Sequence, residues 1–396
     1  MSKLAEPNIV SRLARTLSRR LVLCLLSMPI LGLVMVEIAS TSSLAQTVIR
    51  SGVSSVSLRE VAIVRLKSSR SGGSSVLSLA WSVDGRRLAV SFDWGYQVAV
   101  LDTSNWKEVS RFGGKTFNPE RTMAFLSETE ILTYPEENTQ ASPWAAEIYD
   151  SETGHVLRQI ARPPGHANAS TRGVIVPWGR RVFGIKVGSK VLLFDAKTTE
   201  FVSTLATPPD ASIWAMAPGP GDQLAMALIF PLERARLQVR KPVYLLDALK
   251  NEITGVLPGH VPGVQSVSWS PDGRFIASGV SMLTSDGERK WIRDTDPVRV
   301  WDAMTQQLVV SFEGEFDPVN AISWHPSSAL FATVSAKENP QLGYALRLWS
   351  LSARKLIFEY AAPGNGDFTA LSFNPRTGQL ALAWGGALHV YEVVGL

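Results

Sequence analysis

The chain has a single cysteine and few charged residues for its length of 396 residues. The cysteine, Cys24, lies inside an apolar run near the N-terminus. The rest of the chain therefore cannot form a disulfide or hold a metal through a thiolate. Charged residues make up 19% of the sequence, whereas about a quarter is typical of soluble domains. Apolar residues make up 45%, which is enough for a substantial core.

The chain also lacks an excess of one charge once its N-terminal segment is set aside. The net charge is +4, but residues 1–45 hold five of the 39 basic residues and two of the 35 acidic ones, which leaves 34 and 33. A nucleic-acid-binding domain normally carries a basic face, so this balance argues against a nucleic-acid partner.

The first 45 residues have the three parts of a secretory signal. A polar segment ends in Arg19-Arg20, an apolar run of 16 residues covers 21–36, and small residues lead to Ala45. As a helix the run is about 24 Å long, shorter than the ~30 Å apolar layer of a membrane. We therefore expect export, with cleavage before Gln46 and a place in the bacterial periplasm. The alternative is an uncleaved anchor in the inner membrane that holds the chain on the periplasmic side.

One segment, 259–312, has the pattern of four short strands joined by turns. Apolar and polar residues alternate through much of it, which is the period of a β-strand. Ser270-Pro271-Asp272-Gly273 is a turn sequence, because proline fixes φ and glycine accepts a positive φ. This unit and six weaker copies end at residues 102, 150, 195, 247, 302, 350 and 392, which are 42 to 55 residues apart. A four-stranded propeller blade needs about 40–45 residues plus its loops.

The motifs of this unit resemble those of the WD40-repeat family. Gly259-His260, the turn at 270–273 and Trp301-Asp302 follow the family's order and approximate spacing, and weaker versions recur over residues 58–396. The resemblance implies an all-β, WD40-like, seven-bladed β-propeller of an exported bacterial type. We expect three segments: a signal at 1–45, a linker at 46–57 and the propeller at 58–396.

The two ends of the propeller segment point to a closed ring. The last unit ends just after its third strand, and an unassigned strand-like segment at 59–67 precedes the first complete unit. We predict that this N-terminal strand completes the last blade, with Val61–Leu66 beside Leu388–Val393. Such closure would remove a long exposed sheet edge.

The resemblance also implies structural roles for the motif residues. In WD40 blades a histidine, a serine or threonine, an aspartate and a tryptophan can form a buried hydrogen-bonded chain. His260, Ser278 and Trp301 match three of these positions, with Asp302 directly after the tryptophan. The aspartate of the chain could be Asp294 or Asp296, and an insertion leaves that choice open. None of these residues is expected to be catalytic.

Several units carry insertions between their second and third strands, and we expect these to bind a protein or peptide partner. In the WD40 architecture these connections share one face with the loops that enter the blades, so the insertions would gather over blades 2, 4, 5 and 6. Trp and Arg are enriched at interface hot spots, and the residues we assign to partner binding are Trp94, Arg236, Arg240 and Trp291. The alternative is that the insertions are merely tolerated on the surface. They cover Pro135–Pro143, Pro231–Pro242, Met282–Pro297 and Ala336–Tyr344.

Catalytic signatures are missing from the sequence. It has no Gly-x-Ser-x-Gly motif, no phosphate-binding loop and no His-Glu-x-x-His motif, and its five histidines lie in different repeats. Asp294-Thr295-Asp296 suggests a solvated turn more than a cation site, because the other loop positions lack carboxylates at the required alternation. We therefore predict no catalytic residue, no metal and no cofactor. The alternative is a propeller hydrolase or oxidoreductase with a site in its central channel, since a fold does not decide function.

Overall fold

The computed structural model describes residues 35–39, 46–50 and 55–395 with internal gaps. The gaps are 68–75, 93–96, 114–122, 134–142, 166–170, 176–181, 188–189, 206–211, 230–240, 261–262, 281–283, 286–289, 292–295, 314–317, 337–342 and 362–367. All regular secondary structure in the described part is β-strand. None of the described residues forms a helix long and apolar enough to cross a membrane.

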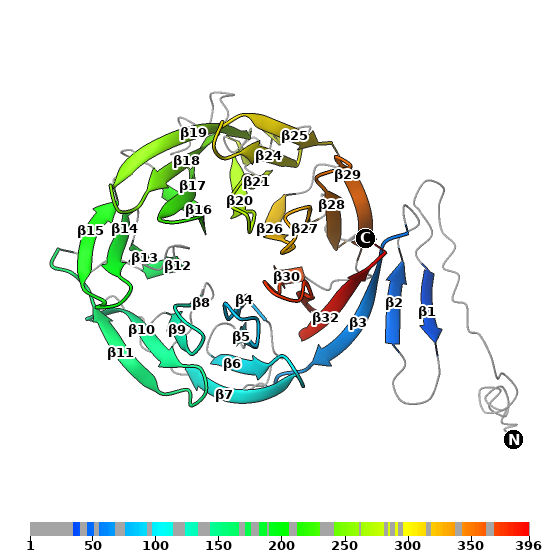
Figure 1. The fold of residues 1–396 in the computed structure, drawn as a ribbon, viewed down its shortest axis with the longest axis horizontal. Helices are drawn as coiled ribbons and strands as arrows, with labels where there is room; N and C mark the ends of the chain where they lie inside the picture. The colour runs from blue at the N-terminus through cyan, green and yellow to red at the C-terminus, as the bar shows by residue number, and fades with distance from the viewer. Residues whose placement is uncertain are drawn as a thin grey trace, which may run out of the picture.

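Seven antiparallel sheets stand around a ring, which makes the fold a seven-bladed β-propeller (Figure 1). Blades 1 to 4 each take four consecutive strands, numbered here from the innermost outwards. Blade 1 has β4 (Ser78–Trp81), β5 (Arg87–Phe92), β6 (Gln97–Asp102) and β7 (Lys107–Gly113); blade 2 has β8 (Met123–Phe125), β9 (Glu130–Thr133), β10 (Trp144–Asp150) and β11 (Val156–Ala161); blade 3 has β12 (Thr171–Ile175), β13 (Val182–Val187), β14 (Lys190–Asp195) and β15 (Phe201–Leu205); blade 4 has β16 (Ser212–Pro218), β17 (Gln223–Ile229), β18 (Lys241–Asp247) and β19 (Glu252–His260).

Blades 5 to 7 continue the ring, and blade 7 takes its outer strand from the N-terminal side of the chain. Six of the seven expected unit ends, from residue 102 to residue 350, are the last residues of third strands, and residue 392 lies within β32. Blade 5 has β20 (Val264–Trp269), β21 (Phe275–Val280), β24 (Val298–Asp302) and β25 (Leu308–Phe312); blade 6 has β26 (Val319–Trp324), β27 (Leu330–Ala336), β28 (Tyr344–Ser350) and β29 (Lys355–Ala361); blade 7 has β30 (Phe368–Phe373), β31 (Leu380–Trp384), β32 (Ala387–Val394) and β3 (Ser57–Val64).

A strand from the predicted N-terminal segment closes the last blade, but it begins earlier than Val61 and ends at Val64, so Arg65 and Leu66 lie outside it. β3 pairs antiparallel with β32, from Leu58 opposite Val393 to Val64 opposite Leu388, with a bulge between Glu60 and Ala62. The two strands run side by side in Figure 1. Leu58 is fully buried, so the N-terminal strand contributes to the core as well as to the ladder. The predicted closure of the last blade is confirmed.

Two further strands extend this sheet on the outer side of β3. β1 (Met35–Ala39) pairs with β2 (Gln46–Arg50), and β2 pairs with β3 outside the ring (Figure 1). β1 lies within the segment expected to be a secretory signal, and β2 lies within the expected linker 46–57. The predicted cleavage before Gln46 falls at the start of β2.

The core consists of seven apolar layers, each between two neighbouring blades. One layer, for example, joins Leu88 and Val90 of blade 1 to Ala381 and Val390 of blade 7. Because a blade has a neighbour on each face, its middle strands are buried on both faces, and the four central residues of β6 are all buried. This burial explains why apolar and polar residues alternate only weakly in the middle strands of several repeats.

Candidate interaction face and the blade that supports it

The connections between second and third strands differ greatly in length. They are 10, 11, 17 and 7 residues long in blades 2, 4, 5 and 6, but 4, 2 and 2 residues long in blades 1, 3 and 7. All blades share one strand order in one ring, so these connections lie on the same face, which we call the insertion face. The opposite face, the turn face, carries the turns between first and second and between third and fourth strands.

Of the four sequence-predicted binding residues, only Trp291 lies in a described segment. Trp291 lies in β23 (Lys290–Trp291), which pairs with β22 (Thr284–Ser285) to form a short hairpin inside the blade 5 connection. Trp94, Arg236 and Arg240 lie outside the described residues, in the connections of blades 1 and 4. That these four residues form one site stays a prediction.

The described bases of these connections are braced by hydrogen bonds. In blade 5 the backbone N–H of Val280 donates to the carbonyl of Pro297 over 2.9 Å, on either side of the connection. In blade 1 the guanidinium of Arg111 lies 4.9 Å from the ring centre of Phe92 and donates to Oε1 of Gln97 over 2.8 Å. The connections of blades 5 and 1 therefore begin and end on fixed strands, which is the arrangement in which loops commonly carry binding residues.

A buried polar chain lies beneath the longest connection, in blade 5. Nε2 of His260 is 3.0 Å from Oγ of Ser278, and the indole N–H of Trp301 donates to the same oxygen over 3.1 Å. His260 and Ser278 are fully buried and Trp301 is 3% exposed. Two of the residues assigned to the blade motif, His260 and Trp301, thus lie within hydrogen-bond distance of a third, Ser278.

An arginine, which sequence reasoning missed, extends this chain. Arg299 is 1% exposed, and its Nη1 lies 3.3 Å from Nδ1 of His260 and also donates to the carbonyl of Gly259. Its Nη2 lies 3.1 Å from Oδ2 of Asp296. Of the two aspartates considered for this chain, Asp296 therefore contacts the arginine, and Asp294 lies outside the described residues.

The contacts fix the proton on His260. A guanidinium has only donors, so Nδ1 facing Arg299 must accept. Nε2 lies 3.0 Å from the backbone carbonyl of Ser278, which can only accept, so Nε2 carries the hydrogen. His260 is therefore neutral and donates toward Ser278. The sequence did hold a signal that could have identified Arg299 as part of the buried chain. Arg299 is a charged residue between Val298 and Val300, in the middle of an expected strand.

Asp302 has a different role from its neighbours in the motif. Its Oδ1 accepts from the backbone N–H groups of Met304 and Thr305 over 3.1 and 2.9 Å, which caps the turn after β24. The hydrogen bond from the Thr305 N–H is the main reason that the pKa of Asp302 lies below its ordinary value. Equivalent aspartates begin the same turn in blades 1 to 4, at Asp102, Asp150, Asp195 and Asp247.

In the described part of the chain, no three His, Cys, Asp or Glu side chains are grouped so that they could hold a metal ion. The alternative of an enzyme with a channel site stays a prediction, because fold alone does not decide it.

Comparison with known proteins places this geometry in a known fold. Two segments, 251–287 and 306–338, match the family model described as WD domain, G-beta repeat. A solved structure, the β-propeller domain of Cps50 (Swd1) from Myceliophteria thermophila, is similar with a TM-score of 0.62 at 15% identity, over 84% of this chain and 99% of that one. None of the curated proteins compared matches the sequence. The chain therefore has the fold of a seven-bladed β-propeller, and two segments on either side of the third strand of its fifth blade are similar to WD repeats.

Proposed function

We propose that this protein is an exported scaffold that binds a protein or peptide partner through its insertion face. The observation that carries the proposal is the placement of four long connections, in blades 2, 4, 5 and 6, on one face of a closed ring. Rigid strands hold the bases of the connections, so a partner could be bound at little cost in ordering the scaffold.

The residue types in these connections support a protein partner. Trp291 and Arg236 belong to residue types that are enriched at interface hot spots. WD40 propellers are also commonly used for protein–protein interaction. The near balance of charge after residue 45 gives no basic face for nucleic acid.

Export is the second part of the proposal, and it rests on the sequence of residues 1–45. Cell fractionation combined with N-terminal sequencing tests it. We expect the chain in the periplasmic fraction, starting at Gln46. A membrane-bound chain that keeps residues 1–45 would favour the anchored alternative, and a chain in the cytoplasm would contradict export.

The partner-binding proposal is tested by affinity capture from the envelope fraction. The double variant Trp291→Ala with Arg236→Ala should lose the captured partner at least tenfold, with little change in melting temperature, because neither residue belongs to the four strands of a blade. The matched control is Met304→Ala with Arg376→Ala, which removes one exposed apolar residue and one exposed arginine from the turn face.

The control should capture the partner as the unaltered protein does. Equal capture by the insertion-face variant, or equal loss in both variants, would place the binding site elsewhere.

A further inference from the structure

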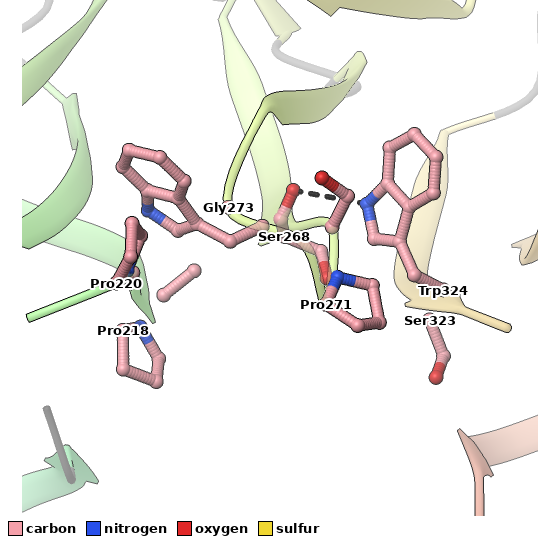
Figure 2. A pocket seen from close by; sticks show the side chains of 11 residues that line it. Pro218, Pro220, Ser268, Pro271, Gly273, Ser323 and Trp324 are labelled. Carbon is pink, nitrogen blue, oxygen red and sulfur yellow. Dashed lines mark hydrogen bonds between the residues drawn. The ribbon is translucent and has the colours of Figure 1, made fainter. Parts of the chain in front are cut away.

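A pocket of about 220 Å³ lies on the turn face, where the innermost strands of blades 4, 5 and 6 end. Its walls include the indoles of Trp269 and Trp324 and the rings of Pro218, Pro220 and Pro271, several of which Figure 2 shows around the opening. Both tryptophans are the last residues of their strands. This pocket is on the face opposite to the long connections and plays no part in the proposed function.

The pocket lies at the junction between blades 4 and 5. This junction lacks a hydrogen bond, from a tryptophan indole to the preceding blade, that two other blade junctions have. The indole N–H of Trp324 donates to the carbonyl of Ser268 in the preceding blade over 3.2 Å (Figure 2). Trp81, at the same strand position in blade 1, donates to the carbonyl of Ser372 over 3.3 Å. The equivalent indole N–H, of Trp269, is buried but has no hydrogen-bond partner. The junction between blades 4 and 5 is therefore built differently.

Ring contacts replace the missing bond at this junction. A Cβ atom on Gly219 would come within 2.6 Å of Cε2 of Trp269, so the indole lies directly against the glycine backbone. A Cβ on Gly273 would come within 2.7 Å of Cγ of Pro220, which places the two turns in contact as well. These apolar contacts leave the proline rings and the two indoles as the walls of an opening beside the strand ends.

The polar groups in the lining are neutral. None of the described residues that line the pocket is charged, and their polar side-chain groups include the hydroxyls of Ser268 and Ser323. The Ser323 oxygen accepts the backbone N–H of Phe373 over 2.9 Å, so its own hydrogen can be donated. A charged ligand would find no counter-charge here. The volume is also below the roughly 300–1,000 Å³ of pockets that hold cofactor-sized ligands.

We propose that this pocket binds a proline-rich segment of a partner protein in the polyproline II conformation. Such a segment offers apolar rings and carbonyl groups with no internal hydrogen bonds. Aromatic-lined grooves recognise it because the conformation is already formed before binding. Trp269 is partly exposed and supplies the aromatic face for the peptide, whereas Trp324 is 5% exposed and adds little accessible surface. The hydroxyls of Ser268 and Ser323 donate to the peptide carbonyls.

The test is calorimetric titration of the full chain with a synthetic decaproline peptide, with a (Gly-Ser)5 peptide of equal length as the control ligand. We expect saturable binding of decaproline and none of the control peptide. Trp269→Ala removes one wall, and Ser268→Leu fills the opening from a partly exposed position without removing a hydrogen bond made by its carbonyl. Each variant should bind decaproline at least tenfold more weakly.

Two matched variants separate this site from other effects. Trp81→Phe alters the equivalent tryptophan outside the pocket, and Trp291→Ala with Arg236→Ala alters the insertion face, so both should bind decaproline as the unaltered protein does. Because Ser268→Leu keeps both indoles, it remains informative if Trp269→Ala does not fold. Absence of saturable binding, equal binding of both peptides, or unchanged binding by the folded pocket variants would overturn the proposal.

Discussion

Blades 3 and 5 have the same four-stranded topology but different interiors. Blade 5 carries the buried polar side chains of Ser278, Arg299 and Trp301, which contact His260 at the end of β19 in blade 4. In blade 3 the strand register places Ile185, Leu192 and Phe194 where blade 5 has Ser278, Arg299 and Trp301. All three are buried, and the ring of Phe194 stacks on Phe183 with centroids 5.5 Å apart.

The difference shows that strand ladders and apolar burial are sufficient to form a blade. The polar chain adds directional bonds that an apolar layer lacks, and breaking them leaves buried groups unsatisfied. The two matched segments of the family model, 251–287 and 306–338, flank the third strand of blade 5 and do not reach blade 3. Resemblance to the family is thus clearest around the polar blade, whereas the fold extends around the whole ring.

The largest expected loss of stability comes from replacing Arg299 of blade 5 with leucine, the residue type that blade 3 has at the equivalent position, Leu192. Arg299→Leu would leave Asp296, His260 and the Gly259 carbonyl without their arginine contacts. Breaking one side of a buried charged contact costs about 3–5 kcal/mol, and we expect this loss in the free energy of unfolding by chemical denaturation. Leu192→Met in blade 3 is the conservative control and should cost less than about 1.5 kcal/mol. A cost below 1 kcal/mol for Arg299→Leu would show that the polar chain is dispensable.

A smaller loss is expected when the hydroxyl of the polar chain is removed. Ser278→Ala leaves the indole N–H of Trp301 without its hydroxyl acceptor and removes one contact of His260, at a cost of about 2 kcal/mol. In blade 6 the indole of Trp349 donates to Oγ1 of Thr333 over 2.9 Å, so Thr333→Val breaks one such bond and should cost about 1 kcal/mol. Thermal unfolding of the two variants measures the difference between these losses of stability. A larger loss for Thr333→Val than for Ser278→Ala would contradict the prediction.

The junction tryptophans give the next prediction. Trp81→Phe removes an indole N–H that bonds to the neighbouring blade and should cost about 0.5–1.5 kcal/mol. Trp269→Phe removes an N–H that has no partner and should cost less, or stabilise the protein. The denaturation midpoints of the two variants test this prediction. Equal losses of stability in both would mean that the hydrogen bond of the Trp81 indole N–H does not cause the loss.

The smallest effect for a single residue is expected at the turn aspartates, and it should not distinguish the two blades. Backbone N–H groups, of Thr198 foremost, hold the pKa of Asp195 in blade 3 below its ordinary value, as Thr305 does for Asp302 in blade 5. A lowered folded-state pKa gives stability that is present above the ordinary pKa of 3.8 and is lost as the pH falls through the folded-state value.

Asp195→Asn and Asp302→Asn should therefore each reduce the pH dependence of unfolding below about pH 4, to a similar small extent. Unfolding measured between neutral and strongly acidic pH tests this. A clear dependence on which blade carries the substitution would contradict the equivalence of the turns.

The sequence was sufficient to predict the ring because turn residues and unit ends repeat along the chain. The unassigned strand at 59–67 also revealed the closure. Arg299 could not be placed, because both faces of a third strand are buried between neighbouring blades and alternation no longer separates inside from outside. The pocket could not be predicted either, because Trp81, Trp269 and Trp324 occupy equivalent strand positions. The environment of Trp269 differs from that of the other two tryptophans because the preceding blade places Pro218 and Gly219 beside it.

Hydrogen exchange of the protein with and without its captured partner tests most directly whether the insertion face is the binding surface. Slower exchange on binding should appear in the connections at 134–143, 230–240, 281–297 and 337–343, while the turns of the opposite face exchange at unchanged rates. Protection confined to the turn face, with the four connections unaffected, would contradict the proposed function.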